Sequence, residues 1–114
     1  LKNELEISKE FAMNFDCILC LKNNTTLITD GYNSYLNINA LPSLAKAGSG
    51  DFLRGVILGL ANKSEDLLFN VAASNFIFGL LSVEASKEID ENSLLITDLT
   101  KYISKVIRRI KDAK

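Results

Sequence analysis

The sequence lacks histidine altogether and contains little proline or cysteine, with one Pro and two Cys in 114 residues. Histidine is the side chain that most readily exchanges protons near neutral pH, so histidine-based catalysis and histidine metal sites are excluded. An excess of charge is also lacking, since 13 basic and 14 acidic residues give a net charge of −1. The chain therefore has no basic field for nucleic acid, and we predict no nucleic-acid partner. Any acid–base chemistry falls to Asp, Glu, Lys, Tyr or Cys.

The two cysteines, Cys17 and Cys20, have the C-x-x-C spacing of redox pairs and of half a zinc site. They lie inside the apolar run 17–21, and the sequence has no second cysteine pair or histidine to complete a metal shell. On a strand, the two thiols would point to opposite faces. We therefore predict reduced core thiols, no metal site and a cytoplasmic location.

Long uninterrupted hydrophobic runs are absent as well. The longest apolar stretch, 67–85, is broken by Asn70, Asn75, Gly79 and Glu84, which predicts a buried helix and no membrane partner. Hydrophobic residues make up 47% of the sequence and charged residues 24%. This composition and length predict one globular domain over residues 1–114. The first residue is not methionine, so the chain is expected to be a fragment of a longer protein.

The apolar periodicity predicts helices alternating with short strands. Helices are expected at 1–13, 51–61 and 65–87, and a last helix from residue 93 or 97 to 111. Strands are expected at 17–21, 25–29 and 32–38, with a hairpin at Lys22-Asn23-Asn24. The first strand is apolar throughout, which is typical of a strand inside a parallel sheet flanked by helices. Together these elements predict a layered α/β fold with a short central sheet.

Gly48-Ser49-Gly50-Asp51 stands directly before an apolar helical pattern. The small residues let backbone N–H groups approach a ligand, and the start of a helix adds unpaired N–H groups and positive dipole. This combination favours an anion, and Asp51 beside it can accept a proton from a hydroxyl next to a phosphate. The alternative is a plain loop in which Ser49 or Asp51 caps the helix.

Two pairs of residues allow both a structural and a functional interpretation. Gly55 and Gly59 permit the close approach of a neighbouring backbone, either in simple packing or behind a nucleotide loop. Phe76 and Phe78 are expected in the core, and they also suit the wall of an adenine pocket. The sequence leaves these alternatives open.

Segment 41–58, L-P-S-L-A-K-A-G-S-G-D-F-L-R-G-V-I-L, resembles the pattern N-P-G-M-A-T-G-G-[ST]-G-D-V-L-A-G-[IV]-I-A. That pattern is typical of the ADP/ATP-dependent NAD(P)H-hydrate dehydratases, carbohydrate-kinase-like members of the ribokinase-like superfamily. Segments 21–28, 30–37 and 94–99 resemble three further motifs of this family in the same order. Family members are considerably longer, so the resemblance is to their C-terminal, nucleotide-binding portion.

The resemblance implies dehydration of hydrated NADH or NADPH, driven by ADP or ATP through phosphorylation of the ring hydroxyl and elimination of phosphate. It implies a small-molecule substrate, a homo-oligomer, and Mg²⁺ with ligands outside this chain. Asp51 would be catalytic as a base or orienting carboxylate. The anion hole would be formed by Gly48, Ser49 and Gly50. The phosphate and ribose of the nucleotide would be lined by Lys22, Asn23, Asn24, Thr25 and Thr26.

Four positions depart from the family pattern, namely Asn23, Lys46, Ala47 and Phe78. Lys46 adds a positive charge beside the expected phosphate site, which would help to bind an anion. Two other functions stay open. One is a different ribokinase-like kinase, acting on a vitamin or a sugar, and the other is a non-catalytic structural remnant of the same fold.

Overall fold

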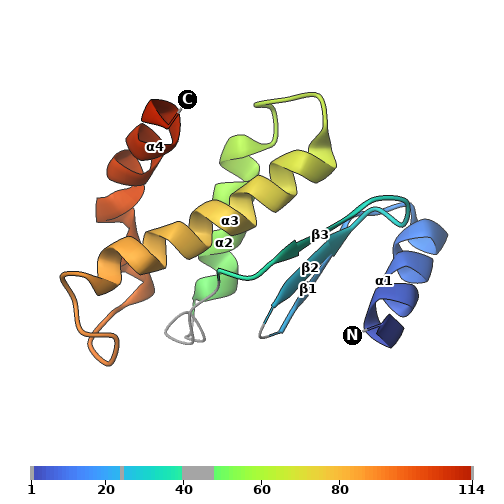
Figure 1. Ribbon diagram of the computed structural model, residues 1–114, viewed down its shortest axis with the longest axis horizontal. Helices are drawn as coiled ribbons and strands as arrows, with labels where there is room; N and C mark the ends of the chain where they lie inside the picture. The colour runs from blue at the N-terminus through green and yellow to red at the C-terminus, as the bar shows by residue number, and fades with distance from the viewer. Residues whose placement is uncertain (1, 24, 40–47, 114) are drawn as a thin grey trace.

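The computed structural model describes residues 2–23, 25–39 and 48–113 of the chain (Figure 1). The predicted layered α/β fold is confirmed. The last predicted helix is divided into a 3₁₀ segment and an α-helix. In order, the elements are α1 (Lys2–Phe15), β1 (Leu19–Lys22), β2 (Thr26–Thr29), β3 (Ser34–Asn37), α2 (Ser49–Leu60), α3 (Leu67–Ser86), η2 (Ile96–Tyr102) and α4 (Ile103–Asp112).

The three strands form an antiparallel sheet in the order β1-β2-β3. Lys22 pairs with Thr26 at the predicted first hairpin. At the second turn, the Asp30 carboxylate accepts hydrogen bonds from the backbone N–H groups of Tyr32 and Asn33, both at 2.8 Å. The parallel neighbour that is typical of an apolar strand such as β1 is absent among the described residues, where a short polar turn reverses the chain after β1, as the predicted hairpin requires, and again after β2.

The strands differ in burial. Every residue of β2 is buried, whereas most of β3 is exposed. β1 is half-buried although its sequence is apolar. It lies at one edge of the described sheet, so the expectation that it is buried on both faces is wrong for this part of the chain.

Both cysteines are free and half-buried. Cys20 faces α3, where the side-chain amide of Asn75 lies 3.9 Å from its sulfur. Burial raises the pKa of the Cys20 thiol, against the opposing effects of this contact and of the Lys22 charge. A raised pKa disfavours the reactive thiolate, which suits a packing residue better than a redox pair.

α3 crosses the molecule in front of α2, with the sheet on one side and α4 on the other (Figure 1). Asp66 caps it by accepting a hydrogen bond from the N–H of Phe69 at 3.0 Å. Leu81 and Ala85 are fully buried. Within the described residues, α3 is the one helix long and apolar enough to span a membrane, but 56% of that apolar window is buried inside the protein. The apolar composition of α3 is explained by its burial inside the protein, as predicted from the sequence.

A buried carboxylate joins α3 to α4. The Glu84 side chain is 4% exposed and lies 3.2 Å from Lys87, 2.7 Å from Lys105 and 2.5 Å from Arg109. The hydrogen bond from Lys105, with a smaller effect from Lys87, lowers the pKa of Glu84 to about 2 despite desolvation by burial. Because an unpaired buried charge is strongly destabilising, these contacts fix α4 against α3.

Replacing Glu84 should reveal this stabilisation through its pH dependence. The pKa falls from 4.5 to about 2 on folding, so the contribution is fully present above pH 4.5 and is lost as pH falls toward 2. We expect Glu84→Gln to lower Tm at neutral pH. The difference in Tm between the variant and the wild type should become smaller as pH falls from 4.5 toward 2. Thermal melts followed by circular dichroism measure both. Glu65→Gln, at an exposed position, is the control, and a deficit that is constant with pH would contradict the assignment.

Candidate site at the start of α2

α2 begins at Ser49, and Gly48 is its N-cap residue with a left-handed φ of +88°. Glycine adopts this conformation without steric cost. The Gly48 carbonyl accepts a hydrogen bond from the N–H of Phe52 at 3.0 Å. No side chain caps the helix among the described residues, so the alternative in which Ser49 or Asp51 caps it is wrong. The first-turn N–H groups therefore lack a side-chain acceptor there, as an anion site requires.

Asp51 lies in the first turn of α2, and its side chain is 82% exposed. Its carboxylate lies 2.5 Å from the guanidinium of Arg54. Arg54 was not predicted as a site residue, although an acid and a base three positions apart on a helix are a recognisable signal. An exposed pair of this kind contributes only about 0–1 kcal/mol, so either group can exchange its partner for a ligand.

Lys22, at the end of β1, is connected to the start of α2 through two aromatic rings. Its ammonium nitrogen lies 5.8 Å from the centroid of the Phe78 ring. The Phe78 ring stacks on Phe52 with 5.8 Å between centroids, and Phe52 directly follows Asp51. Figure 1 shows the end of β1 and the start of α2 at the same lower side of the molecule. Phe78 is thus confirmed as a core residue, and its face attracts the lysine charge.

The other predicted residues of the hairpin are placed differently. Thr26 is buried and pairs with Lys22 across the ladder. The Asn23 amide is directed to α1, 3.5 Å from the Glu4 carboxylate, and its backbone N–H donates to the Thr25 carbonyl at 3.0 Å. The structure therefore brings Lys22, but not the Asn23 side chain, toward α2. Outside the described residues lie Asn24, Lys46 and Ala47.

An apolar groove of about 510 Å³ extends along α2 from Asp51 and past the end of the helix to Lys63. Its lining includes Gly55 and Gly59, and Ile103 of α4 lies across from them. A Cβ at either glycine would meet nothing within 4 Å. The expectation that these glycines receive a neighbouring backbone is therefore wrong among the described residues. They widen a groove that offers uncharged ligand atoms an apolar surface beside Asp51.

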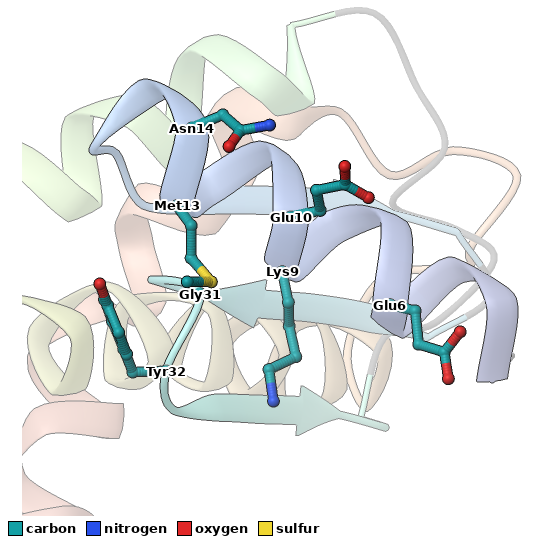
Figure 2. Close-up of a pocket in the computed structure, with 7 residues that line it drawn as sticks. All are labelled: Glu6, Lys9, Glu10, Met13, Asn14, Gly31 and Tyr32. Carbon is teal, nitrogen blue, oxygen red and sulfur yellow. The ribbon is translucent and has the colours of Figure 1, made fainter.

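Two further hollows lie away from the start of α2. One, of about 280 Å³ between the sheet and α3, is lined in part by Phe76. Phe76 is 48% exposed, so its expected place in the core is wrong. The other, of about 550 Å³, lies between α1 and the β2–β3 turn, and Figure 2 shows Lys9, Met13, Gly31 and Tyr32 among its lining residues. Neither hollow is lined by a predicted site residue.

The sequence matches the model of the carbohydrate-kinase family described as NAD(P)H-hydrate dehydratase over residues 1–109. The chain belongs to this family. It is 32% identical over 108 residues to the ADP-dependent (S)-NAD(P)H-hydrate dehydratase of Nitrosopumilus maritimus. It is 30% identical over 113 residues to the bifunctional NAD(P)H-hydrate repair enzyme of Moorella thermoacetica. These matches cover 94% and 97% of this chain, but 37% and 21% of the relatives.

Solved structures show the same relationship. The ADP/ATP-dependent NAD(P)H-hydrate dehydratase of Bacillus subtilis, co-crystallised with ATP/Mg²⁺, is 30% identical with a TM-score of 0.86, covering 95% of this chain and 39% of that one. The hypothetic protein SMU.573 of Streptococcus mutans is 27% identical with a TM-score of 0.75, covering 91% and 38%. The chain thus shares part of the fold of these proteins and spans less than half of their length.

Two alanine substitutions should distinguish the left-handed cap from the helical position beside it. Gly48→Ala should lower the free energy of unfolding by about 1–2 kcal/mol, because an L-residue is strained at this φ. Crowding does not contribute, since a Cβ there meets nothing within 4 Å. Gly50→Ala, also in open space but within the helix, is the matched control and should leave stability unchanged or raised. Urea unfolding measures both, and equal losses would contradict the assigned cap.

Proposed function

We propose that this chain is the nucleotide-binding part of an ADP- or ATP-dependent dehydratase that repairs hydrated NADH or NADPH. The observation that carries the proposal is the start of α2, where a left-handed Gly48 cap leaves Asp51 exposed beside first-turn N–H groups. Family membership and the names of the relatives support it. Because the chain spans less than half of those relatives, the substrate and the complete activity are part of the proposal.

The start of α2 is suited to hold the terminal phosphate of the nucleotide. Backbone N–H groups of Ser49 and Gly50 belong to the open first turn, and the helix dipole adds positive potential there. Lys22, held over Phe78, brings a full positive charge to the same side of the core. Arg54 can supply another when it leaves Asp51. These groups bind an anion without requiring any change in the fold.

Asp51 is placed to handle the proton of the attacking hydroxyl. In the first step, the ring hydroxyl oxygen forms a bond to the terminal phosphorus while the bond from phosphorus to the bridging oxygen breaks. The hydroxyl proton must leave, and the exposed Asp51 carboxylate can accept it. In the second step, the carbon–oxygen bond to the phosphate and a carbon–hydrogen bond on the neighbouring ring carbon break, which releases inorganic phosphate and a proton and restores the ring double bond. In the absence of substrate, the Asp51 carboxylate is paired with Arg54.

The described residues contain no preformed cluster of metal-binding side chains. Within 2–23, 25–39 and 48–113, no group of three or more His, Cys, Asp or Glu side chains is arranged to hold a metal ion. Asp51 is paired with Arg54 rather than with another carboxylate. The sequence-based expectation that Mg²⁺ ligands lie outside this chain stays a prediction, and the role proposed for Asp51 is proton transfer alone.

Nucleotide binding by the chain is the first test. We expect ADP or ATP to raise Tm saturably, because a ligand that binds only the folded state stabilises it, by about 2.7 kcal/mol at a hundred times its Kd. A thermal-shift titration with ADP, ATP and AMP, with and without Mg²⁺, measures this. Gly48→Ala should reduce the shift. A cooperative melt that no nucleotide moves would contradict the proposal and favour the structural remnant.

Asp51→Asn tests the catalytic role separately from binding. In a preparation that turns over hydrated NADH, we expect kcat to fall by about 10² or more, since the amide cannot accept the hydroxyl proton. The nucleotide-induced rise in Tm should persist. Asp112→Asn, at an exposed position near the end of α4, is the matched control. Retained turnover in Asp51→Asn would overturn the assignment, and turnover of a sugar or vitamin but not of the hydrate would favour a different kinase.

A further inference from the structure

Arg54 places a positive charge where the pattern that segment 41–58 resembles has an alanine, three positions after the aspartate. The residue belongs to α2, and its side chain is 78% exposed. Packing does not explain an arginine that lies in solvent. Capping does not explain it either, because a guanidinium has no acceptor for the N–H groups of the first turn. The contact of Arg54 with Asp51 is therefore the observation that needs a functional explanation.

The charged end of Arg54 lies at the start of α2, although the residue itself is one turn further along the helix. In an α-helix the Cα–Cβ bonds tilt toward the N-terminus, and residues three positions apart share a face. The Arg54 guanidinium accordingly donates to the Asp51 carboxylate at 2.5 Å. Because Asp51 belongs to the first turn, the guanidinium is within reach of an anion held by the N–H groups of that turn.

The pair between Asp51 and Arg54 is weak enough to be exchanged. Its two side chains are 82% and 78% exposed, and water screens the attraction between charges in such positions. The carboxylate of Glu84, in contrast, is 4% exposed and contacts three cations. A phosphate group offers the planar guanidinium two parallel hydrogen bonds and more negative charge than one carboxylate. An incoming phosphate therefore competes well with Asp51 for Arg54.

We propose that Arg54 determines specificity for the terminal phosphate of the nucleotide, and that by leaving Asp51 to bind this phosphate it frees the carboxylate. This inference rests on the proposed function and adds a condition to it. In the free chain, Asp51 accepts a hydrogen bond from Arg54. In the complex, Arg54 donates to phosphate oxygens, and the Asp51 carboxylate becomes free to accept the hydroxyl proton. The base is thus released only when the phosphate site is occupied.

Isothermal titration calorimetry of the chain with ADP, AMP and inorganic pyrophosphate tests the phosphate contact. Arg54→Ala should raise the Kd for ADP and for pyrophosphate by about tenfold, the usual effect of losing a charge-assisted hydrogen bond. The Kd for AMP, which has no second phosphate, should change much less. Arg54→Lys keeps the charge but not the two-pronged donor, so its Kd values should lie between those of the wild type and Arg54→Ala.

Arg108→Ala, at another exposed arginine on α4, is the matched control and should leave all three Kd values unchanged. The Tm of ligand-free Arg54→Ala should stay close to that of the wild type, because an exposed ion pair contributes little to stability. Unchanged Kd values in Arg54→Ala, or equal losses for ADP and AMP, would overturn the proposal. An unchanged Kd for ADP with a raised KM for the hydrated cofactor would also overturn it, and would place Arg54 on a phosphate of the substrate.

Nuclear magnetic resonance of the Asp51 carboxyl carbon tests the release of the base. On addition of pyrophosphate to the wild type, we expect this resonance to move toward its position in ligand-free Arg54→Ala, where no guanidinium is present. A resonance that does not move while pyrophosphate binds would overturn the release.

These measurements separate the inference from the proposed function. Binding of pyrophosphate through Arg54 by a chain that binds no adenine nucleotide would support the inference and contradict the function. Nucleotide binding that Arg54→Ala leaves unchanged would overturn the inference alone. A wild-type chain that binds neither pyrophosphate nor nucleotide would overturn both.

Discussion

The burial of α3 around most of its circumference is the constraint on which the other elements depend. On one side, Asn75 and Phe69 contact Cys20 of β1 and Tyr35 of β3. Toward α2, Phe78 stacks on Phe52. At its C-terminal end, the carboxylate of Glu84 holds α4 through Lys105 and Arg109. The sheet, α2 and α4 are therefore positioned by a shared central helix.

This arrangement explains how residues distant in the sequence meet at the candidate site. Phe78 of α3 contacts both Lys22 of β1 and Phe52 of α2. Its ring sets the position of the Lys22 charge relative to the start of α2. The departure of Phe78 from the family pattern is accommodated because its ring is buried and fills the core.

Local signals were sufficient for much of the fold. Helical periodicity located α2 and α3, a polar turn located the first hairpin, and the glycine motif was placed at a helix start. What could not be predicted depended on three-dimensional neighbours. The cap is Gly48 rather than Ser49 because the backbone enters the left-handed region there. Phe76 and Gly59 are exposed because no described element packs against them, and sequence periodicity does not identify which faces stay uncovered.

Sequence periodicity also failed to predict the form of the last helix. Periodicity predicted one helix, whereas the chain forms a 3₁₀ segment that changes to α4 at Ile103. Asp98 accepts a hydrogen bond from the N–H of Leu95 at 2.9 Å, and Leu99 is fully buried. The 3₁₀ segment is thus stabilised by a local cap and by packing on α3. The spacing of apolar residues in the sequence indicates neither the cap nor the packing partner.

The close contact of Gly31 with Met13 and Lys9 has a consequence for recognition. Because Gly31 has no Cβ, α1 packs directly on the β2–β3 turn, and this close contact restricts movement of the helix toward the turn. The orientation of its outward face is therefore set within the chain itself. A surface that is rigid before association loses less conformational entropy when it is covered, so more of the gain from apolar burial would remain as net affinity.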